Sequence, residues 1–248
     1  MPVLFGINPV IEALKAGARS FDYVAVMAGR RDARAQSIFE ACRDAGVPVR
    51  QVSRDQLERL AGTHTHQGVV AVTSEKQYSD LDEVLDNKRG AHNFLVILDG
   101  VEDPHNLGAI IRTADAAGAD GLVIPERRAV GVTGTVLKAS AGAAEYLPIA
   151  RVTNINRTLE DLKERNIWTI GMDERGKQSY DEVDYNMDCA LVVGAEGSGL
   201  HEQVRKKCDF LISIPMLGHV SSLNVSVAAA VVMYEALRQR RHLKAKKS

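Results

Sequence analysis

Short apolar runs alternate with amphipathic stretches along the first 74 residues, and this pattern predicts a small α/β domain. Apolar runs at 23–27, 47–52 and 68–72 are expected to be strands. Helices are expected over 8–17, where Asn8 before Pro9 suggests a cap, over 32–45, and after Ser53, which opens a capping-box sequence. Residues 75–91 are polar and predict a linker.

Residues 92–248 predict a second domain built on a parallel β-sheet. Continuous apolar runs alternate there with helical segments: runs at 94–98, 122–124, 167–170, 190–193 and 211–214, helices at 107–117, 134–144, 156–165, 200–207 and 222–240. Strands that are apolar throughout are buried on both faces, as in a sheet covered by helices. Ligands of such sheets bind beyond the carboxyl ends of the strands. The loops that follow these strands are therefore the candidate site.

Composition narrows the class of protein to a globular one. Of the 248 residues, 45% are hydrophobic and 25% are charged. No apolar run reaches the roughly 18 residues of a membrane helix, and the N-terminus lacks a secretory pattern. The three cysteines are odd in number and widely spaced, as free thiols of a reducing compartment are. We therefore expect a cytoplasmic protein with no membrane association.

The charge pattern permits a nucleic-acid partner without requiring one. The net charge is −1, which argues against coating nucleic acid through bulk charge. Basic clusters occur nevertheless, at Arg30, Arg31 and Arg34, at Arg127 and Arg128, at 205–207 and in a tail over 238–247. Each cluster is equally well explained as a solvated helix end or chain terminus.

The loop after the run at 94–98 contains the first candidate residues. Asn106 stands where a helix cap is expected. Arg112 lies off the apolar stripe of the following helix, so it is able to face the strand ends and offer a guanidinium fork to phosphate. Spacing alone favours the alternative, a surface pair between Arg112 and Asp115.

The loop after the run at 190–193 is rich in glycine. Gly194, Gly197 and Gly199 fall within six residues around Glu196, which allows a ligand to approach the backbone closely. The order differs from the dinucleotide fingerprint, and no phosphate-binding lysine follows, so a nicotinamide or ATP site is disfavoured. A tight structural turn is the alternative explanation.

The third loop follows the run at 211–214. It contains Ile214, Met216, Ser222, Leu223 and Asn224 and leads into a helix that is apolar nearly all round. Ser222 and Asn224 also suit plain helix capping. Such a helix must be covered on most sides, by its own domain or by a second subunit. Two histidines at 64 and 66, without nearby cysteines or carboxylates, make a poor metal site, and no metal is expected.

Together the three loops resemble the signature motifs of the SpoU-type ribose methyltransferases of the knotted SPOUT superfamily. The matching residues are Asn106, Leu107, Gly108 and Arg112 in motif 1, Gly194, Glu196, Gly197, Gly199 and Leu200 in motif 2, and 214–216 with 221–228 in motif 3. The segments 5–10 and 66–71 are similar to the L30e-like substrate-binding domain found in many of these enzymes. Within the family, the chain is most similar to enzymes that methylate a guanosine of bacterial 23S ribosomal RNA.

The resemblance implies a fold, a cofactor and a set of site residues. It implies a trefoil-knotted cofactor site in the parallel-sheet domain over 92–248, an L30e-like RNA-binding domain over 1–74, and a homodimer whose active site lies at the subunit interface. S-adenosylmethionine is the implied cofactor. Its implied contacts are Gly194, Gly199, Ile214, Met216 and Leu223, and the implied catalytic residues are Arg112, Asn106, Glu196, Ser222 and Asn224.

The implied reaction is an in-line transfer of a methyl group to a ribose 2′-hydroxyl, which must lose a proton. No histidine or free carboxylate is evident at the site in the sequence, and arginine holds its proton too tightly to act as a base. We therefore expect Arg112 to stabilise the developing alkoxide and to hold a phosphate, with a phosphate oxygen or water as proton acceptor. A transfer-RNA methyltransferase of the same family and a non-catalytic RNA-binding protein are the alternatives.

Overall fold

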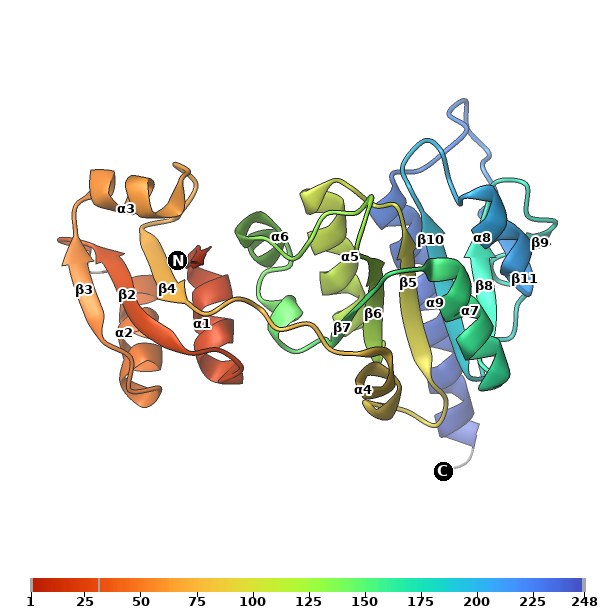
Figure 1. Cartoon of the computed structure of the whole chain (residues 1–248), viewed down its shortest axis with the longest axis horizontal. Helices are drawn as coiled ribbons and strands as arrows, with labels where there is room; N and C mark the ends of the chain where they lie inside the picture. The colour runs from red at the N-terminus through yellow and green to blue at the C-terminus, as the bar shows by residue number, and fades with distance from the viewer. Residues whose placement is uncertain (1, 31, 247–248) are drawn as a thin grey trace. The chain divides into compact units, whose positions relative to one another are not determined.

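The computed structural model describes residues 2–30 and 32–246, with side chains up to residue 241 at the C-terminal end (Figure 1). The chain divides into two compact units. One contains Met1–Gln77 together with Val132–Tyr146, and the other contains Tyr78–Gly131 together with Leu147–Ser248. The sequence did not predict that 132–146 belongs to the first unit. It predicted an ordinary helix there, within the second domain.

The first unit is a four-stranded mixed sheet with helices. Its elements are β1 (Val3–Phe5), α1 (Ile7–Ala16), β2 (Phe21–Met27), α2 (Ala33–Asp44), β3 (Val49–Val52), α3 (Arg54–Ala61), β4 (Val69–Thr73), α6 (Gly134–Ala139) and the short helix η1 (Ala143–Glu145). The strand order is β1-β4-β2-β3, with only β2 and β3 parallel. The predicted strands and the capping box of Ser53 and Gln56 are confirmed, whereas β1 was missed.

The predicted cap at Asn8 is wrong. Helix α1 begins one residue earlier, with Gly6 in the capping position at φ 99°. The backbone N–H of Ile7 donates to Oε1 of Gln67, 3.0 Å away, so a side chain 60 residues distant replaces the local cap. Asn8 itself is an exposed residue of the first turn.

A buried ion pair joins the two chain segments of this unit. The Arg19 guanidinium donates from Nε to a carboxylate oxygen of Glu145 at 2.9 Å, and the two side chains are 2% and 1% exposed. Removal of one partner would leave the other charge buried and unpaired, which is strongly destabilising. The pair therefore accounts for the attachment of 143–145 to the N-terminal residues.

The second unit is a parallel sheet covered on both faces, as predicted. Its elements are α4 (Leu81–Asp86), β5 (Phe94–Asp99), α5 (Pro104–Ala116), β6 (Gly121–Pro125), β7 (Ile149–Val152), α7 (Ile155–Glu164), β8 (Trp168–Met172), β9 (Gln178–Ser179), β10 (Cys189–Gly194), α8 (Glu202–Lys207), β11 (Phe210–Ser213) and α9 (Val225–Lys246). Among the described residues the strand order is β7-β6-β5-β10-β8-β11-β9, and every pairing is parallel. The short strands β7 and β9 end the sheet and were missed.

Helices α4, α7 and α8 contribute apolar side chains to the core on one face of this sheet, and α5 and α9 pack together on the other. In Figure 1, α7 lies in front of the strands and α9 behind them. Helix α4 falls in the stretch predicted as a linker, and its Val84 is fully buried. No helix in the described part of the chain is long and apolar enough to cross a bilayer.

Arg240 anchors the end of helix α9. Its guanidinium donates to four backbone carbonyl oxygens at 2.8–2.9 Å, and it lies 4.9 Å from the centre of the Phe94 ring. The sequence had placed Arg240 in a solvated basic tail, whose end at Lys247 lies outside the described residues, as does Arg31 of the first basic cluster. The carbonyl partners come from residues 92–93 and 185–187, far away in sequence, so no local pattern could reveal this anchor.

We expect Arg240→Ala to destabilise the protein by about 3 kcal/mol, because it leaves several partly buried carbonyls without a donor. Urea unfolding measures the change. Arg238→Ala is the matched control, since the Arg238 side chain is 57% exposed and, among the described residues, pairs only with Glu235 one turn away. An unfolding midpoint as high for Arg240→Ala as for Arg238→Ala would contradict the anchor.

Candidate active site

The sheet topology places the loops that follow β5, β10 and β11 at the same end of the parallel strands. The chain leaves β5 toward β6 and β7 on one side, then crosses to β8, and β10 pairs between β5 and β8. In this pairing Gly194 at the end of β10 lies opposite Asp99 at the end of β5. The loops that follow these strands therefore start side by side, at the point where ligands of α/β sheets bind.

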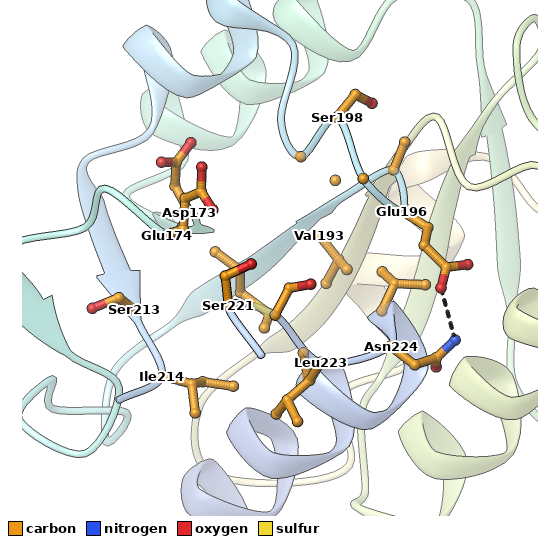
Figure 2. Close-up of a pocket in the computed structure, with 18 of the residues that line it drawn as sticks. Asp173, Glu174, Val193, Glu196, Ser198, Ser213, Ile214, Ser221, Leu223 and Asn224 are labelled. Carbon is orange, nitrogen blue, oxygen red and sulfur yellow. Dashed lines mark hydrogen bonds between the residues drawn. The ribbon is translucent and has the colours of Figure 1, made fainter. Parts of the chain in front are cut away.

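A cavity of about 580 Å³ opens beyond the ends of β8, β10 and β11. Its lining includes the predicted residues Gly194, Glu196, Gly199, Ile214, Met216, Ser222, Leu223 and Asn224. Figure 2 shows Asp173 and Glu174 on one side of this cavity and Glu196 on the other. A volume of this size is typical of a pocket for a small molecule or cofactor.

Asn106, Glu196 and Asn224 form a hydrogen-bonded cluster that links the three predicted loops. Asn106 Nδ2 donates to Glu196 Oε2 at 2.9 Å. Asn224 Nδ2 donates to Asn106 Oδ1 at 3.0 Å and to Glu196 Oε1 at 3.3 Å, the contact drawn in Figure 2. The carboxylate of Glu196 is thus fixed by two amides from segments 90 and 28 residues away.

The sequence suggested that Asn106 caps its helix, but in the structure it does not. Asp103 takes that position in α5, where its Oδ1 accepts from the backbone N–H groups of His105 and Asn106, each at 2.8 Å. Pro104 then begins the helix, where its missing N–H costs nothing. With the cap supplied by Asp103, the amide of Asn106 is available to Glu196 and Asn224.

Asn224, in contrast, caps helix α9 and also belongs to the hydrogen-bonded cluster. Its Oδ1 accepts from the backbone N–H groups of Ser226 and Val227 at the start of α9, at 3.0 and 3.4 Å. Its Nδ2 remains for the cluster. Ser222 is exposed and lines the cavity without belonging to the cluster.

The glycines at 194 and 199 in the second loop are explained by different physical reasons. A Cβ at Gly194 would lie 2.2 Å from the carbonyl carbon of Gly199, so the chain's own backbone requires glycine there. Ala195 and Gly199 exchange two backbone hydrogen bonds of 3.0 Å that hold this close approach. Gly199 has a positive φ of 66°, and a Cβ there would meet nothing within 4 Å. Gly199 therefore leaves open space beside its backbone, as Gly197 does, whereas Gly194 does not.

Arg112 does not reach the cavity of the single chain. Its side chain is exposed on α5 and does not line the cavity. It lies six residues beyond Asn106, about 9 Å along the helix axis. The alternative pairing with Asp115 is not found either, because Asp115 pairs with Arg89 at 2.9 Å. Among the described residues, we find no hydrogen bond or ion pair to Arg112.

Three charged cavity residues were missed by the sequence analysis. Asp173, Glu174 and Arg175 follow β8 and line the cavity, and the buried Asp173 accepts from Arg175 at 2.9 Å. The Arg175 guanidinium holds the pKa of the Asp173 carboxyl below its usual value. The sequence feature that could have revealed them is their position shortly after the predicted strand at 167–170. In the described part of the chain no cluster of three or more potential metal ligands is found.

Comparisons with known proteins agree with this geometry. Residues 93–234 match the model of the SpoU rRNA Methylase family, and residues 3–79 match the model named RNA 2′-O ribose methyltransferase substrate binding. The first match covers more than half of the chain. The fold and the site thus define an RNA methyltransferase, and the chain belongs to the SpoU rRNA methylase family, which confirms the resemblance.

Relatives align along nearly the whole chain. The 23S rRNA (guanosine-2′-O-)-methyltransferase RlmB of Bordetella pertussis is 47% identical, over 96% of this chain and 97% of its own length. A putative TrmH family tRNA/rRNA methyltransferase of Bacillus subtilis, YacO, is 46% identical over 96% and 95%. The SpoU methyltransferase AviRb of Streptomyces viridochromogenes, solved with AdoMet, has a TM-score of 0.80 at 28% identity, over 97% of this chain and 90% of its own.

Proposed function

We propose that this enzyme transfers the methyl group of S-adenosylmethionine to the ribose 2′-hydroxyl of a guanosine in 23S ribosomal RNA. The observation that carries the proposal is the cavity lined by the second and third motif loops, at whose edge Asn106 of the first loop is linked to Glu196 and Asn224. Two relatives that align over nearly the whole chain, from Bordetella pertussis and Ralstonia nicotianae, are named 23S rRNA (guanosine-2′-O-)-methyltransferase RlmB. Two solved structures whose names state tRNA as the substrate align with 65% and 62% of this chain.

The cavity suits S-adenosylmethionine. Ile214, Met216 and Leu223 offer apolar surface to an adenosine, and the open backbone at Gly199 permits close approach. The carboxylates of Asp173 and Glu174 bring negative charge toward a ligand that carries a positive sulfonium. When bound, this cofactor supplies the electrophilic methyl group. We assign the cofactor contacts to Gly194, Gly199, Ile214, Met216 and Leu223.

The residues at the edge of the cavity orient the acceptor. Asn106 and Asn224 hold the Glu196 carboxylate in one direction, and Ser222 adds a hydroxyl to the lining of the cavity. Such fixed groups align the ribose oxygen with the methyl carbon before reaction, which lowers the entropic part of the barrier. Arg112 supplies a positive charge for the developing alkoxide and its neighbouring phosphate.

A second copy of the chain completes this site. Arg112 lies outside the cavity of its own chain, so its proposed role requires a cavity from a partner. Four large apolar side chains of the third motif loop and helix α9 are exposed. They are Leu217, Val220, Val227 and Tyr234, whose exposed fractions are 99%, 71%, 49% and 51%. We take these side chains to form one patch, since contiguous exposed apolar patches mark interaction surfaces. A homodimer with its active site at the interface therefore explains both observations.

We assign RNA binding to the first unit, with the L30e-like fold that the resemblance implies. The substrate-binding family match over 3–79 supports this assignment. The trefoil knot of the methyltransferase domain is proposed on the same resemblance. The domain boundaries at 74 and 92 and the cytoplasmic location stay predictions.

The function is tested by incubating the purified full-length protein with labelled S-adenosylmethionine and either ribosomal or transfer RNA from a strain that lacks the gene. We expect label at one guanosine ribose of 23S RNA, because the RlmB relatives that align over nearly the whole chain are named for this reaction. Primer-extension mapping locates it. Label in transfer RNA alone would establish the alternative substrate, and cofactor binding absent by calorimetry would establish the non-catalytic alternative.

A further inference from the structure

A second cavity of about 290 Å³ adjoins the first and contains a histidine that the sequence analysis overlooked. The two cavities share Ala195, Glu196, Ser198 and Val225. The second is also lined by Asn106, Arg128 and His201. Because Glu196 lines both cavities, a nucleotide bound in the second would lie beside a cofactor bound in the first.

His201 is held by a buried carboxylate. Asp99, the last residue of β5, is 5% exposed. Its Oδ2 accepts from the backbone N–H of His201 at 2.8 Å, and its Oδ1 lies 3.0 Å from His201 Nδ1. In the neutral imidazole this arrangement places the proton on Nδ1 and leaves Nε2 as an acceptor. No partner of Nε2 is found among the described residues.

The His201 side chain has no evident structural task. It stands at the N-cap position of α8 but makes no capping hydrogen bond, and it is 49% exposed. Gly100, with φ 88°, gives the ring room, since a Cβ there would lie 3.3 Å from His201 Cε1. The Asp99 carboxylate thus orients a ring that is otherwise free to meet a ligand.

We propose that His201 is the proton acceptor of the methyl transfer and that Asp99 is its positioning residue. This assignment rests on the proposed function. The 2′-hydroxyl gives its proton to Nε2 while its oxygen forms the new bond to the methyl carbon, and the carbon–sulfur bond breaks to release S-adenosylhomocysteine. The imidazolium, stabilised by Asp99, then returns the proton to water.

Other charged groups also face this cavity, and the test must separate them from His201. They are Glu102, Asp103, Arg128 and Glu196. Glu196 already accepts from two amides, and Asp103 from two backbone N–H groups, so both carboxylates are occupied. Arg128 is too basic to accept a proton. His201 differs from these groups because Asp99 orients its ring and leaves Nε2 without a partner among the described residues.

The experiment measures single-turnover methylation by the full-length enzyme at saturating cofactor and RNA, from about pH 5 to 9. We expect the wild-type rate to fall on acidification, because a protonated imidazole cannot accept. His201→Gln should lower the plateau rate about 10²-fold and remove that acid limb. Asp99→Asn should act similarly, because its amide would force the proton onto Nε2. Added imidazole should partly rescue His201→Ala.

His92→Gln is the matched control, since His92 also lies beside an aspartate, Asp188 at 3.8 Å, but precedes β5 at the opposite end of the sheet. Its rate and pH profile should equal those of the wild type, and calorimetry should show unchanged cofactor affinity in all variants. An acid limb that persists in His201→Gln, whatever its rate, overturns the assignment. A wild-type protein that binds cofactor but methylates no RNA contradicts the proposed function and this assignment with it.

Discussion

Alanine in place of Arg112 is expected to lower the single-turnover methylation rate by roughly 10²–10³, the scale of one lost preorganised donor. Fold and cofactor affinity should hardly change, because the side chain is exposed and does not line the cofactor cavity. Arg112→Lys should restore little, since it keeps the charge but loses the planar fork. Asp115→Ala is the control. It breaks only a surface pair with Arg89 and should retain full activity.

Mixing two inactive variants tests whether Arg112 serves the partner's cavity. Arg112→Ala and Glu196→Ala chains, unfolded and reassembled together, should form mixed dimers in which one of the two sites carries neither change. Activity should then reappear. If Arg112 acted within its own chain, every site of a mixed dimer would carry one change and the mixture would stay inactive. Full activity of Arg112→Ala by itself would refute any catalytic role.

Gly194→Ala is expected to weaken S-adenosylmethionine binding about 100-fold, or about 2.7 kcal/mol. The new methyl group would lie 2.2 Å from the Gly199 carbonyl carbon, a backbone atom that no side-chain rotation can move away. The loop from 195 to 199 must shift, and the paired hydrogen bonds of Ala195 and Gly199 must break. Since this loop lines the cofactor cavity, its displacement removes the backbone surface that we assign to the cofactor.

Gly197→Ala is the matched control in the same loop, at a glycine that is not among the proposed cofactor contacts. Its Cβ would meet nothing within 4 Å, so the loop can keep its place, and the cost is the left-handed φ of 80°. That conformation should reduce the stability by roughly 1–2 kcal/mol, with cofactor affinity within about tenfold of the wild type. Calorimetric titration with S-adenosylmethionine compares the two variants. Equal affinities would show that the 194–199 contact does not shape the site.

The sequence by itself determined the elements that depend on local patterns. The apolar runs became the central strands β5, β6, β8, β10 and β11, because burial on both faces of a parallel sheet demands apolar residues throughout. The capping box at Ser53 formed, because its hydrogen bonds lie within four residues. Three motif loops were identified for the same reason, since strand ends and glycine clusters are visible without any knowledge of packing.

Only the tertiary structure decided which side chains meet. Asp103 rather than Asn106 caps α5, so Asn106 is free to join Glu196 and Asn224. The register of β5 with β10 brings Asp99 near His201 across 102 residues of chain. Segment 132–146 packs with the N-terminal unit through Glu145, although its sequence looks like any other helix. Such contacts join groups from distant segments, so their energies leave no periodicity in the sequence, and only the folded chain selects them.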